Sequence, residues 1–278
     1  MAKRKRQGGS ATTERRLEEG RGTGRGRDYQ PWLLVQDVPS HGLANRVLGS
    51  TTGREHHLFS NLEFDCFLVF DWADTIIDIR EQYPLLPLEE TLSLAEEAGI
   101  KHPTYPGTDD PDVRTTDFLL TIRRGNMTVE QAIAVKPSEK LASKRVLEKL
   151  ELERRFWEKR QTSWRIVTER DIPRILVENL KWLKPYQRLD ALFPLTGEDV
   201  ARIRAVLEHY RSDTDILTEV TKSVDDRLGL VPGTSLSVAR HLLASRIWRV
   251  DLSLPLLEDG CCLHFLDDLH SPTGVNAS

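Results

Sequence analysis

The chain has 278 residues, enough for a main domain of moderate size and a smaller second one. Charged residues make up 29% and aromatic residues 7% of it, which is ordinary for a soluble globular protein. A formal net charge of −4 excludes a global attraction to nucleic acid, so any such binding must come from local patches of charge.

The cysteines and the N-terminus indicate the compartment. Cys66, Cys261 and Cys262 lack the spacing of a disulfide framework, which favours a reducing compartment. Two adjacent cysteines beside His264 make a poor tetrahedral zinc site, so zinc binding is disfavoured. No secretory signal precedes the chain's first element, and no apolar stretch approaches the roughly 20 residues that span a bilayer. The sequence predicts a cytoplasmic protein with no membrane partner.

Residues 1–28 are predicted to form a disordered basic arm rich in arginine and glycine. The segment has too few apolar groups to offset the entropy lost on ordering. An arm of this composition suits contacts with DNA phosphates, but it is equally typical of a solubilising tail.

Residues 29–169 are predicted to form a mixed α/β domain, because helical and strand patterns alternate there. Residues 32–52 read as loop, and Ser60-x-x-Glu63 is a capping box that begins a helix. The elements expected after it are a strand over 75–83, a helix over 88–98, strands over 114–122 and 129–135, one long helix over 137–159 and a strand over 164–168.

Residues 170–257 are predicted to form a mostly helical, winged-helix-like domain. The expected helices cover about 171–183, 198–211, 214–228 and 235–246, and a strand-like alternation over 247–254 would form the wing. Residues 258–278 are expected to be an acidic and polar tail.

Two charged residues in apolar strands are candidates for phosphodiester chemistry. Asp117 lies inside an apolar strand, where a carboxylate is costly to bury unless it is paired or bound to metal. Lys136 ends the next strand, and Ala134 projects from the same face because side chains alternate with a period of two. Nucleases related to restriction enzymes pair an aspartate on one strand with an acid-x-lysine motif on the next. Here Ala134 stands at the position of the acid.

Glu63 and Glu81 are the candidates for the missing acid. The pattern alone favours a helix-capping role for Glu63, although its carboxylate could also face the site. Glu81 shares a strand face with Ile77 and Ile79, so its carboxylate needs a partner, either a metal ion or a basic residue.

Seven short motifs follow one another along the chain. They are Ser60-Asn61-Leu62-Glu63, Glu81-Gln82-Tyr83-Pro84, His102-Pro103, Thr115-Thr116-Asp117-Phe118, Ala132-Ile133-Ala134-Val135-Lys136, Leu150-Glu151-Leu152-Glu153-Arg154 and Trp164-Arg165-Ile166-Val167-Thr168-Glu169. In this order they resemble the TnsA family, the endonuclease subunits of heteromeric, Tn7-like cut-and-paste transposases. The resemblance covers the residue motifs over roughly 30–170, and for the C-terminal part it rests on the order of the predicted elements.

The resemblance implies a restriction-endonuclease-like fold and a catalytic set of Glu63, Asp117 and Lys136. Glu63 and Asp117 would hold Mg²⁺, or Mn²⁺ in its place, and capping and catalysis would then share Glu63. Some family members carry glutamine where this chain has Ala134, so a main-chain carbonyl at that position would be a further metal ligand. Glu81 remains a candidate ligand.

The resemblance also implies partners. The protein would cut the non-transferred strand at the 5′ ends of a transposon, while a TnsB-like DDE transposase cuts and joins the other strand. A TnsC-like ATPase would contact the C-terminal domain. Residues 169–278 carry more acidic than basic side chains, which favours protein binding over DNA binding there.

The long helix carries the candidate residues for binding the DNA backbone. They are spaced so that pairs four residues apart lie close on a helix surface, although a solvated face is an equally good interpretation. These residues are Lys140, Lys144, Arg145 and Lys149.

Two other functions stay open. A stand-alone restriction or junction-resolving nuclease would have the same core but would cut without partners. A non-catalytic adaptor would keep the fold and the binding surfaces only, and Ala134 is the residue that favours it.

Overall fold

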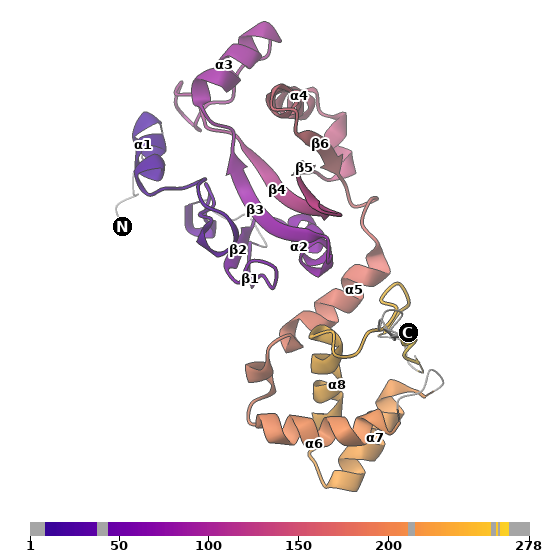
Figure 1. Cartoon of the computed structure of the whole chain (residues 1–278). Helices are drawn as coiled ribbons and strands as arrows, with labels where there is room; N and C mark the ends of the chain where they lie inside the picture. The colour runs from indigo at the N-terminus through magenta and orange to yellow at the C-terminus, as the bar shows by residue number, and fades with distance from the viewer. Residues whose placement is uncertain (1–8, 38–43, 211–214, 257–259, 261, 267–278) are drawn as a thin grey trace, which may run out of the picture. The chain divides into compact units, whose positions relative to one another are not determined.

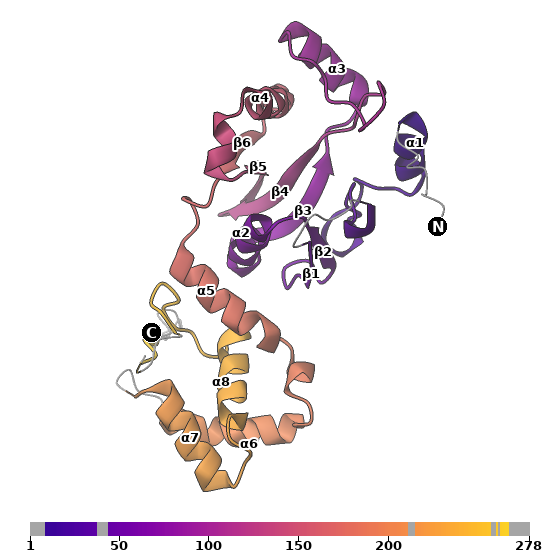
Figure 2. The ribbon, with the colours of Figure 1, turned by 180° about the vertical axis from the view of Figure 1, so that it is seen from behind.

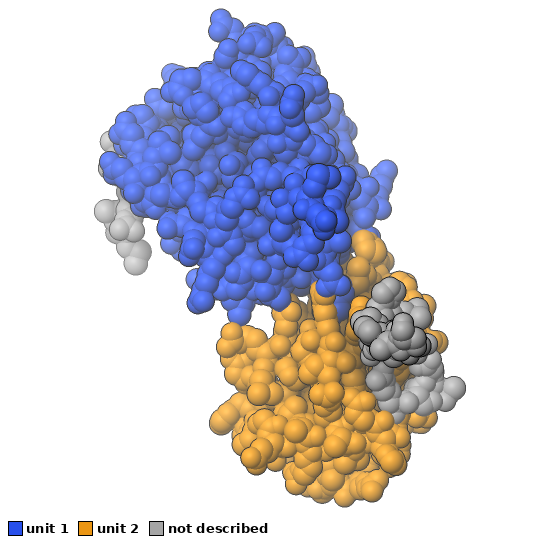
Figure 3. Space-filling view, in the orientation of Figure 1, with its two compact units in different colours: residues 1–172 blue, residues 173–278 orange. Residues whose placement is uncertain are grey.

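The computed structural model describes residues 9–37, 44–210, 215–256, 260 and 262–266. The chain divides into two compact units, Met1–Ile172 and Pro173–Ser278, which Figure 3 distinguishes by colour. The division falls three residues after the boundary predicted at 169/170. No helix in the described ranges is both long enough and apolar enough to cross a membrane.

A four-stranded mixed sheet forms the centre of the first unit (Figure 1). The strands lie in the order β3-β4-β5-β6, with antiparallel pairing from β3 to β5 and parallel pairing between β5 and β6. Their bounds are β3 Ile76–Pro84, β4 Thr115–Arg124, β5 Met127–Val135 and β6 Ser163–Val167. The two residues between β4 and β5 begin with Gly125 at φ 60°, as a tight hairpin requires.

Helices cover both faces of this sheet (Figures 1 and 2). Helix α2 (Asn61–Trp72) packs Phe67 and Phe70 against Ile79 and Phe118 on one face. Burial on both faces explains why the middle of β4 is continuously apolar rather than alternating.

On the other face, α3 (Leu88–Glu97) and α4 (Lys144–Lys159) cover Leu119 and Ala132. The sequence predicts α3 with a small shift at its end, but the start of α4 differs from the prediction. The mixed α/β architecture is consistent with a nuclease-like domain.

The N-terminal segment differs from the predicted disordered arm. Residues 1–8 lie outside the described residues, but Ser10–Glu18 form helix α1 and Gly26–Asp28 a 3-10 turn, η1. Arg21 donates to the main-chain oxygen of Trp32 at 3.2 Å and forms an ion pair with Asp37. Composition suggests disorder because the segment has few apolar groups, whereas Arg21 is buried and has partners 11 and 16 residues further along the chain.

The predicted loop at 32–52 also contains structure that the sequence analysis did not anticipate. A 3-10 turn, η2, covers Val35–Asp37, and β1 (Asn45–Leu48) begins near the end of this range. It pairs antiparallel with β2 (Glu55–Leu58) in a separate two-stranded sheet.

The single helix predicted over 137–159 is wrong. Residues Ser138–Ala142 form a 3-10 helix, η3, and α4 begins only at Lys144. Ser143 between them has the extended backbone of a cap residue, with φ −84° and ψ 120°. Lys140 and Lys144 therefore lie on different elements, and their spacing of four does not make them neighbours on one helix.

The second unit is mostly helical, as predicted. Buried residues from three of its helices include Ile203, Val224 and Val238. Its elements are α5 Arg174–Leu183, η4 Lys184–Tyr186, η5 Leu189–Leu192, α6 Gly197–Glu208, α7 Leu217–Leu228 and α8 Thr234–Ala244.

The predicted wing at 247–254 is not a regular strand. All eight residues are described, and their strand-type pairing is the isolated bridge Val250↔Phe265. Asn179 on α5 holds the end of this segment. Its side-chain amide donates to the main-chain oxygens of Leu252 and Leu254 and accepts from the main-chain nitrogen of Leu256. Most of the predicted tail, 258–278, lies outside the described residues.

Replacing Asn179 should destabilise the second unit. Asn179→Ala leaves three main-chain groups around a buried position without their partner, and we expect a loss of about 2–4 kcal/mol in the free energy of unfolding. Urea denaturation followed by circular dichroism measures it. Asn126→Ala, at an exposed turn, is the control and should change stability by less than about 0.5 kcal/mol. Equal stability of the two variants would contradict the role of Asn179.

Candidate active site

Strands β4 and β5 separate at Asp117. Their paired register ends at Phe118↔Ile133, one step before Asp117 would face Ala134. The carboxylate of Asp117 enters this opening, where its Oδ2 accepts a hydrogen bond from the main-chain nitrogen of Val135 at 2.6 Å. The side chain thus takes the place of a main-chain acceptor in the ladder, which fixes its position.

Lys136 binds the same carboxylate oxygen. Its Nζ lies 2.7 Å from Asp117 Oδ2 and 2.8 Å from the main-chain oxygen of Val135. Burial lowers the pKa of Lys136, but the charge and hydrogen bond of Asp117, together with the charges of Glu153 and Glu63, outweigh burial and raise the net pKa above its usual value. The lysine is therefore cationic at neutral pH, and its side chain is one-third exposed.

Glu63 caps helix α2, as the sequence pattern favours. The Ser60 hydroxyl accepts from the nitrogen of Glu63 at 3.1 Å, and Glu63 accepts from that hydroxyl at 2.9 Å and from the nitrogen of Phe59 at 3.0 Å. Burial raises the pKa of Glu63 to about 7, and the nearby charge of Asp117 acts in the same direction. The helix cap therefore presents Glu63 to Asp117.

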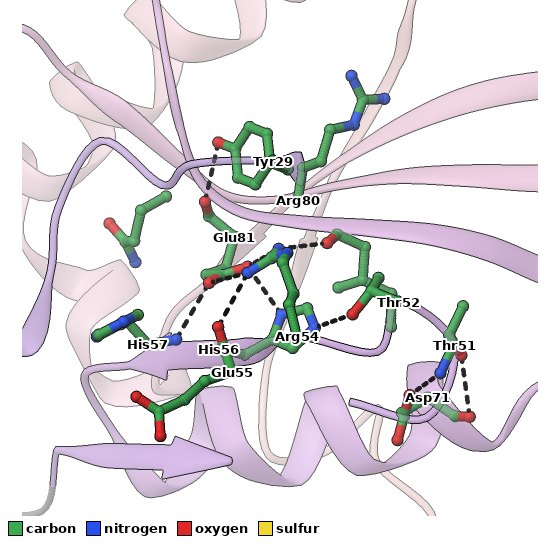
Figure 4. A network of polar contacts seen from close by, with 12 residues as sticks. Tyr29, Thr51, Thr52, Arg54, Glu55, His56, His57, Asp71, Arg80 and Glu81 are labelled. Atoms are coloured by element: carbon green, nitrogen blue, oxygen red, sulfur yellow. Dashed lines mark hydrogen bonds and ion pairs between the residues drawn. The ribbon is translucent and has the colours of Figure 1, made fainter. Parts of the chain in front are cut away.

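Glu81 does not join this site but sits in a separate buried network (Figure 4). Arg54 donates to both of its carboxylate oxygens, His56 Nδ1 lies 2.8 Å from Oε2, and the nitrogen of His57 donates to Oε1 at 3.1 Å. Burial alone would raise the pKa of Glu81, yet the bonds to Arg54 and His56 lower it to about 2.

This network corrects the interpretation of Glu81 as a metal ligand. The sequence predicted either a metal ion or a basic residue as the partner of Glu81. The structure shows the basic residue, because Arg54 in the turn before β2 forms an ion pair with Glu81. The contacts join the β1–β2 sheet to β3 through a fully buried ion pair.

The acidic residues at the opening suit a divalent cation. Within the described ranges no three His, Cys, Asp or Glu side chains converge as a ready-made metal site. Burial and, after it, the nearby charge of Asp117 raise the pKa of Glu63, so its ionised form is disfavoured without a cation beside it. A bound metal ion would supply this positive charge. The side chains fit a partial metal shell that needs further oxygen ligands.

Two family models and a curated relative match this chain. A family model described as the N-terminal part of TnsA-like endonucleases matches residues 73–169, and one for the C-terminal part of TnsA endonucleases matches residues 171–252. A curated relative, the transposon Tn7 transposition protein TnsA of Escherichia coli, is 42% identical over 231 residues, which cover 83% of this chain and 82% of the relative.

The chain belongs to the TnsA family. The resemblance stated from the sequence motifs is confirmed, and with it the assignment to the endonucleases of DNA transposition. The first matched segment contains Asp117 and Lys136 but begins after Glu63, so the placement of Glu63 rests on the structure and on the wider similarity.

Glu153 on α4 is a buried acidic group near Asp117 that the sequence analysis did not single out. It is buried, and its Oε1 accepts from the Thr116 hydroxyl at 2.8 Å and from the Trp164 indole at 3.0 Å. Burial raises the pKa of Glu153 to about 7, with the charge of Asp117 as the next cause. A signal was present in the sequence, since Glu153 lies three residues from both Leu150 and Phe156 on the apolar face of its helix.

The predicted DNA-binding residues are not equivalent in the structure. Arg145 forms an ion pair with Glu148 at 2.9 Å. Lys140 lies on η3, where its Nζ is 3.8 Å from a carboxylate oxygen of Glu139. The pKa of Lys149 is lowered by burial and by the charges of Arg114 and Arg145, and Lys136 acts in the same direction. Cations therefore crowd beside the site. Lys144 at the start of α4 is exposed.

Glu153→Gln should stabilise the protein at high pH. The folded pKa of about 7 lies above the usual 4.5, so ionisation of Glu153 lowers stability as pH rises between these values. The amide keeps an acceptor for Thr116 and Trp164 without the charge. We expect a gain of up to about 3 kcal/mol at pH 8 and almost none below pH 4.5.

Urea denaturation without divalent metal measures both values. Glu151→Gln on the exposed side of the same helix is the comparison, because the pKa of Glu151 is lowered by its hydrogen bonds to Arg154 and shifts in the opposite direction. A pH-independent effect of Glu153→Gln would contradict the burial of an ionisable acid.

Proposed function

We propose that this chain hydrolyses the non-transferred DNA strand next to the 5′ ends of a transposon. The supporting observation is the Asp117–Lys136 pair at the point where β4 and β5 separate, with Glu63 close enough for both charges to act on its carboxyl group. Hydrolysis of a phosphodiester needs acidic groups that hold a divalent metal and a cation that faces the developing charge. The three side chains supply both kinds of group.

Glu63 and Asp117 are the side chains that would hold the ion, Mg²⁺ or Mn²⁺, with the main-chain carbonyl of Ala134 as a further ligand. When bound, the ion would polarise the phosphate and favour ionisation of a coordinated water. Alanine has no carboxylate to contribute, so we expect weak metal binding until DNA supplies additional oxygen ligands.

The protein groups orient the reactants. Val135 and Lys136 hold Oδ2 of Asp117 from two sides, which leaves Oδ1 as the atom that we expect to face the metal. The Lys136 ammonium can donate to the attacking water or to a phosphate oxygen, and its positive charge offsets the charge that develops on the phosphate. Its partial exposure permits contact with DNA.

The cations beside the site are proposed to bind double-stranded DNA. Lys149 lies among Arg114, Arg145 and Lys136, and crowded positive charges are relieved by an anion such as a backbone phosphate. Lys140 and Lys144, which precede Arg145 and Lys149 along the chain, are proposed as further contacts with the DNA backbone.

The second unit is proposed to bind protein partners. The curated relative is named as a transposition protein, and the family resemblance implies a TnsB-like transposase and a TnsC-like ATPase, the latter contacting residues 170–257. The proposal includes a winged-helix-like arrangement of this unit and action on DNA in the bacterial cytoplasm.

Asp117→Ala should abolish cleavage. The change removes both a proposed metal ligand and the partner that fixes Lys136, and we expect the 5′-strand cleavage rate to fall by at least about a hundredfold. The assay combines labelled transposon-end DNA, Mg²⁺, and TnsB-like and TnsC-like partners, with the two strands followed separately. Asp109→Ala, in an exposed loop, is the control.

Cleavage of the 5′ strand by Asp117→Ala at the wild-type rate would contradict the proposal and favour an adaptor role. Rapid cutting by the wild-type chain without partners would identify a stand-alone nuclease instead.

Removing the inner cations should weaken DNA binding in a salt-dependent way. For Arg145→Ala combined with Lys149→Ala, we expect the slope of log affinity against log salt to fall by about one to two, because fewer counterions are released. Fluorescence anisotropy with duplex DNA measures the slope. Lys159→Ala, at the other end of α4 beside Glu90, is the control. An unchanged slope would show that these cations do not contact DNA.

A further inference from the structure

Gln82 has an unusual backbone for its position. It lies within strand β3, yet its φ is +49°, in the left-handed region that residues with a Cβ rarely adopt. Its side chain is buried, with 4% exposed. A buried non-glycine residue keeps such a conformation only where its surroundings impose it, and such residues cluster at functional sites.

The amide of Gln82 connects the start of β4 to the acid on α2. Its Oε1 accepts a hydrogen bond from the Thr115 hydroxyl at 2.9 Å, and its Nε2 lies 3.4 Å from Oε2 of Glu63 as a long hydrogen bond. The main-chain oxygen of Gln82 accepts from the nitrogen of Trp32 at 3.3 Å. Backbone and side chain are thus both held.

The strand register places Gln82 beside the other acid. Glu81 pairs with Phe118 and Tyr83 pairs with Thr116, so Gln82 and Asp117 occupy the step between these pairs. The left-handed residue in β3 therefore lies across from the position where β4 and β5 separate.

The conformation explains how the side chain reaches Glu63. Ile79 packs with α2, and regular alternation would direct Gln82 toward the opposite face of the sheet. The left-handed backbone interrupts this alternation and allows the amide to contact a residue of α2. An amide suits the position because one group accepts from Thr115 while the other donates to a carboxylate.

We propose that Gln82 is a positioning residue that holds the Glu63 carboxylate toward Asp117 for metal binding. The inference rests on the proposed nuclease function and adds a residue to its machinery. Gln82 itself needs no contact with metal or DNA, because it acts through Glu63. Groups that orient a metal ligand typically change metal affinity or activity by about 10–100-fold when removed.

Two variants and a matched control test the proposal. Gln82→Gly removes the amide and tolerates the left-handed backbone, whereas Gln82→Asn also tolerates it but is one methylene too short to span Thr115 and Glu63. Gln161→Gly is the control, because Gln161 is also a left-handed glutamine, with φ +54°, but is exposed after α4.

Binding of MnCl₂ to the full chain is measured from the electron paramagnetic resonance signal of unbound Mn²⁺, and thermal unfolding and 5′-strand cleavage are measured on the same samples. We expect both Gln82 variants to remain folded, to bind Mn²⁺ about tenfold more weakly and to cleave about tenfold more slowly. Gln161→Gly should match the wild-type protein in Mn²⁺ affinity and cleavage.

Wild-type Mn²⁺ affinity and cleavage in either folded Gln82 variant would overturn the proposal, as would unfolding of both variants, which would show a role in stability alone. If Gln82→Gly alone fails to fold, Gln82→Asn decides. Asp117→Ala is assayed alongside. Its full activity would reject the nuclease function itself, whereas its inactivity beside active Gln82 variants would reject only the positioning role.

Discussion

The arrangement of the site depends on one hydrogen-bonded carboxylate. Asp117 occupies the point where β4 leaves β5, and the nitrogen of Val135 and the ammonium of Lys136 bind the same oxygen of its side chain. A strand pair that continued one step further would satisfy Val135 through the main chain and exclude the carboxylate. The opening of the sheet and the charge of the site are therefore one structural feature. Both are supported by helices packed on the two faces of the sheet.

The buried glutamates of the first unit have opposite pKa shifts because their neighbours differ. Glu81 has Arg54 and His56 as partners, and its pKa falls to about 2. Glu63 and Glu153 are buried near Asp117, and the pKa of each rises to about 7. The first carboxylate is a satisfied structural anion. The other two contribute unbalanced negative potential around the proposed metal position, which favours a cation there.

Positive charge is divided in a similar way. Arg21 and Arg54 are buried and form ion pairs within the first unit, so they stabilise its N-terminal segments and are not available to DNA. Lys149 lies among other cations instead. A net charge of −4 is thus compatible with a local surface for phosphate, because binding depends on where cations gather rather than on their total.

The sequence by itself determined the mixed α/β class, the helical second part and the family. It also predicted the helix cap that involves Glu63 and pointed to Asp117 and Lys136 as candidates, because these depend on local patterns and on the cost of burying a charge in an apolar strand. It could not determine the partner of Glu81, the break in the helix at Ser143 or the contacts of Arg21, which follows α1. The left-handed backbone conformation of Gln82 could not be predicted from the sequence either. The ion pair of Glu81, the contacts of Arg21 and the contacts of Gln82 depend on groups that are distant along the chain, and only the tertiary fold brings those groups within hydrogen-bonding distance.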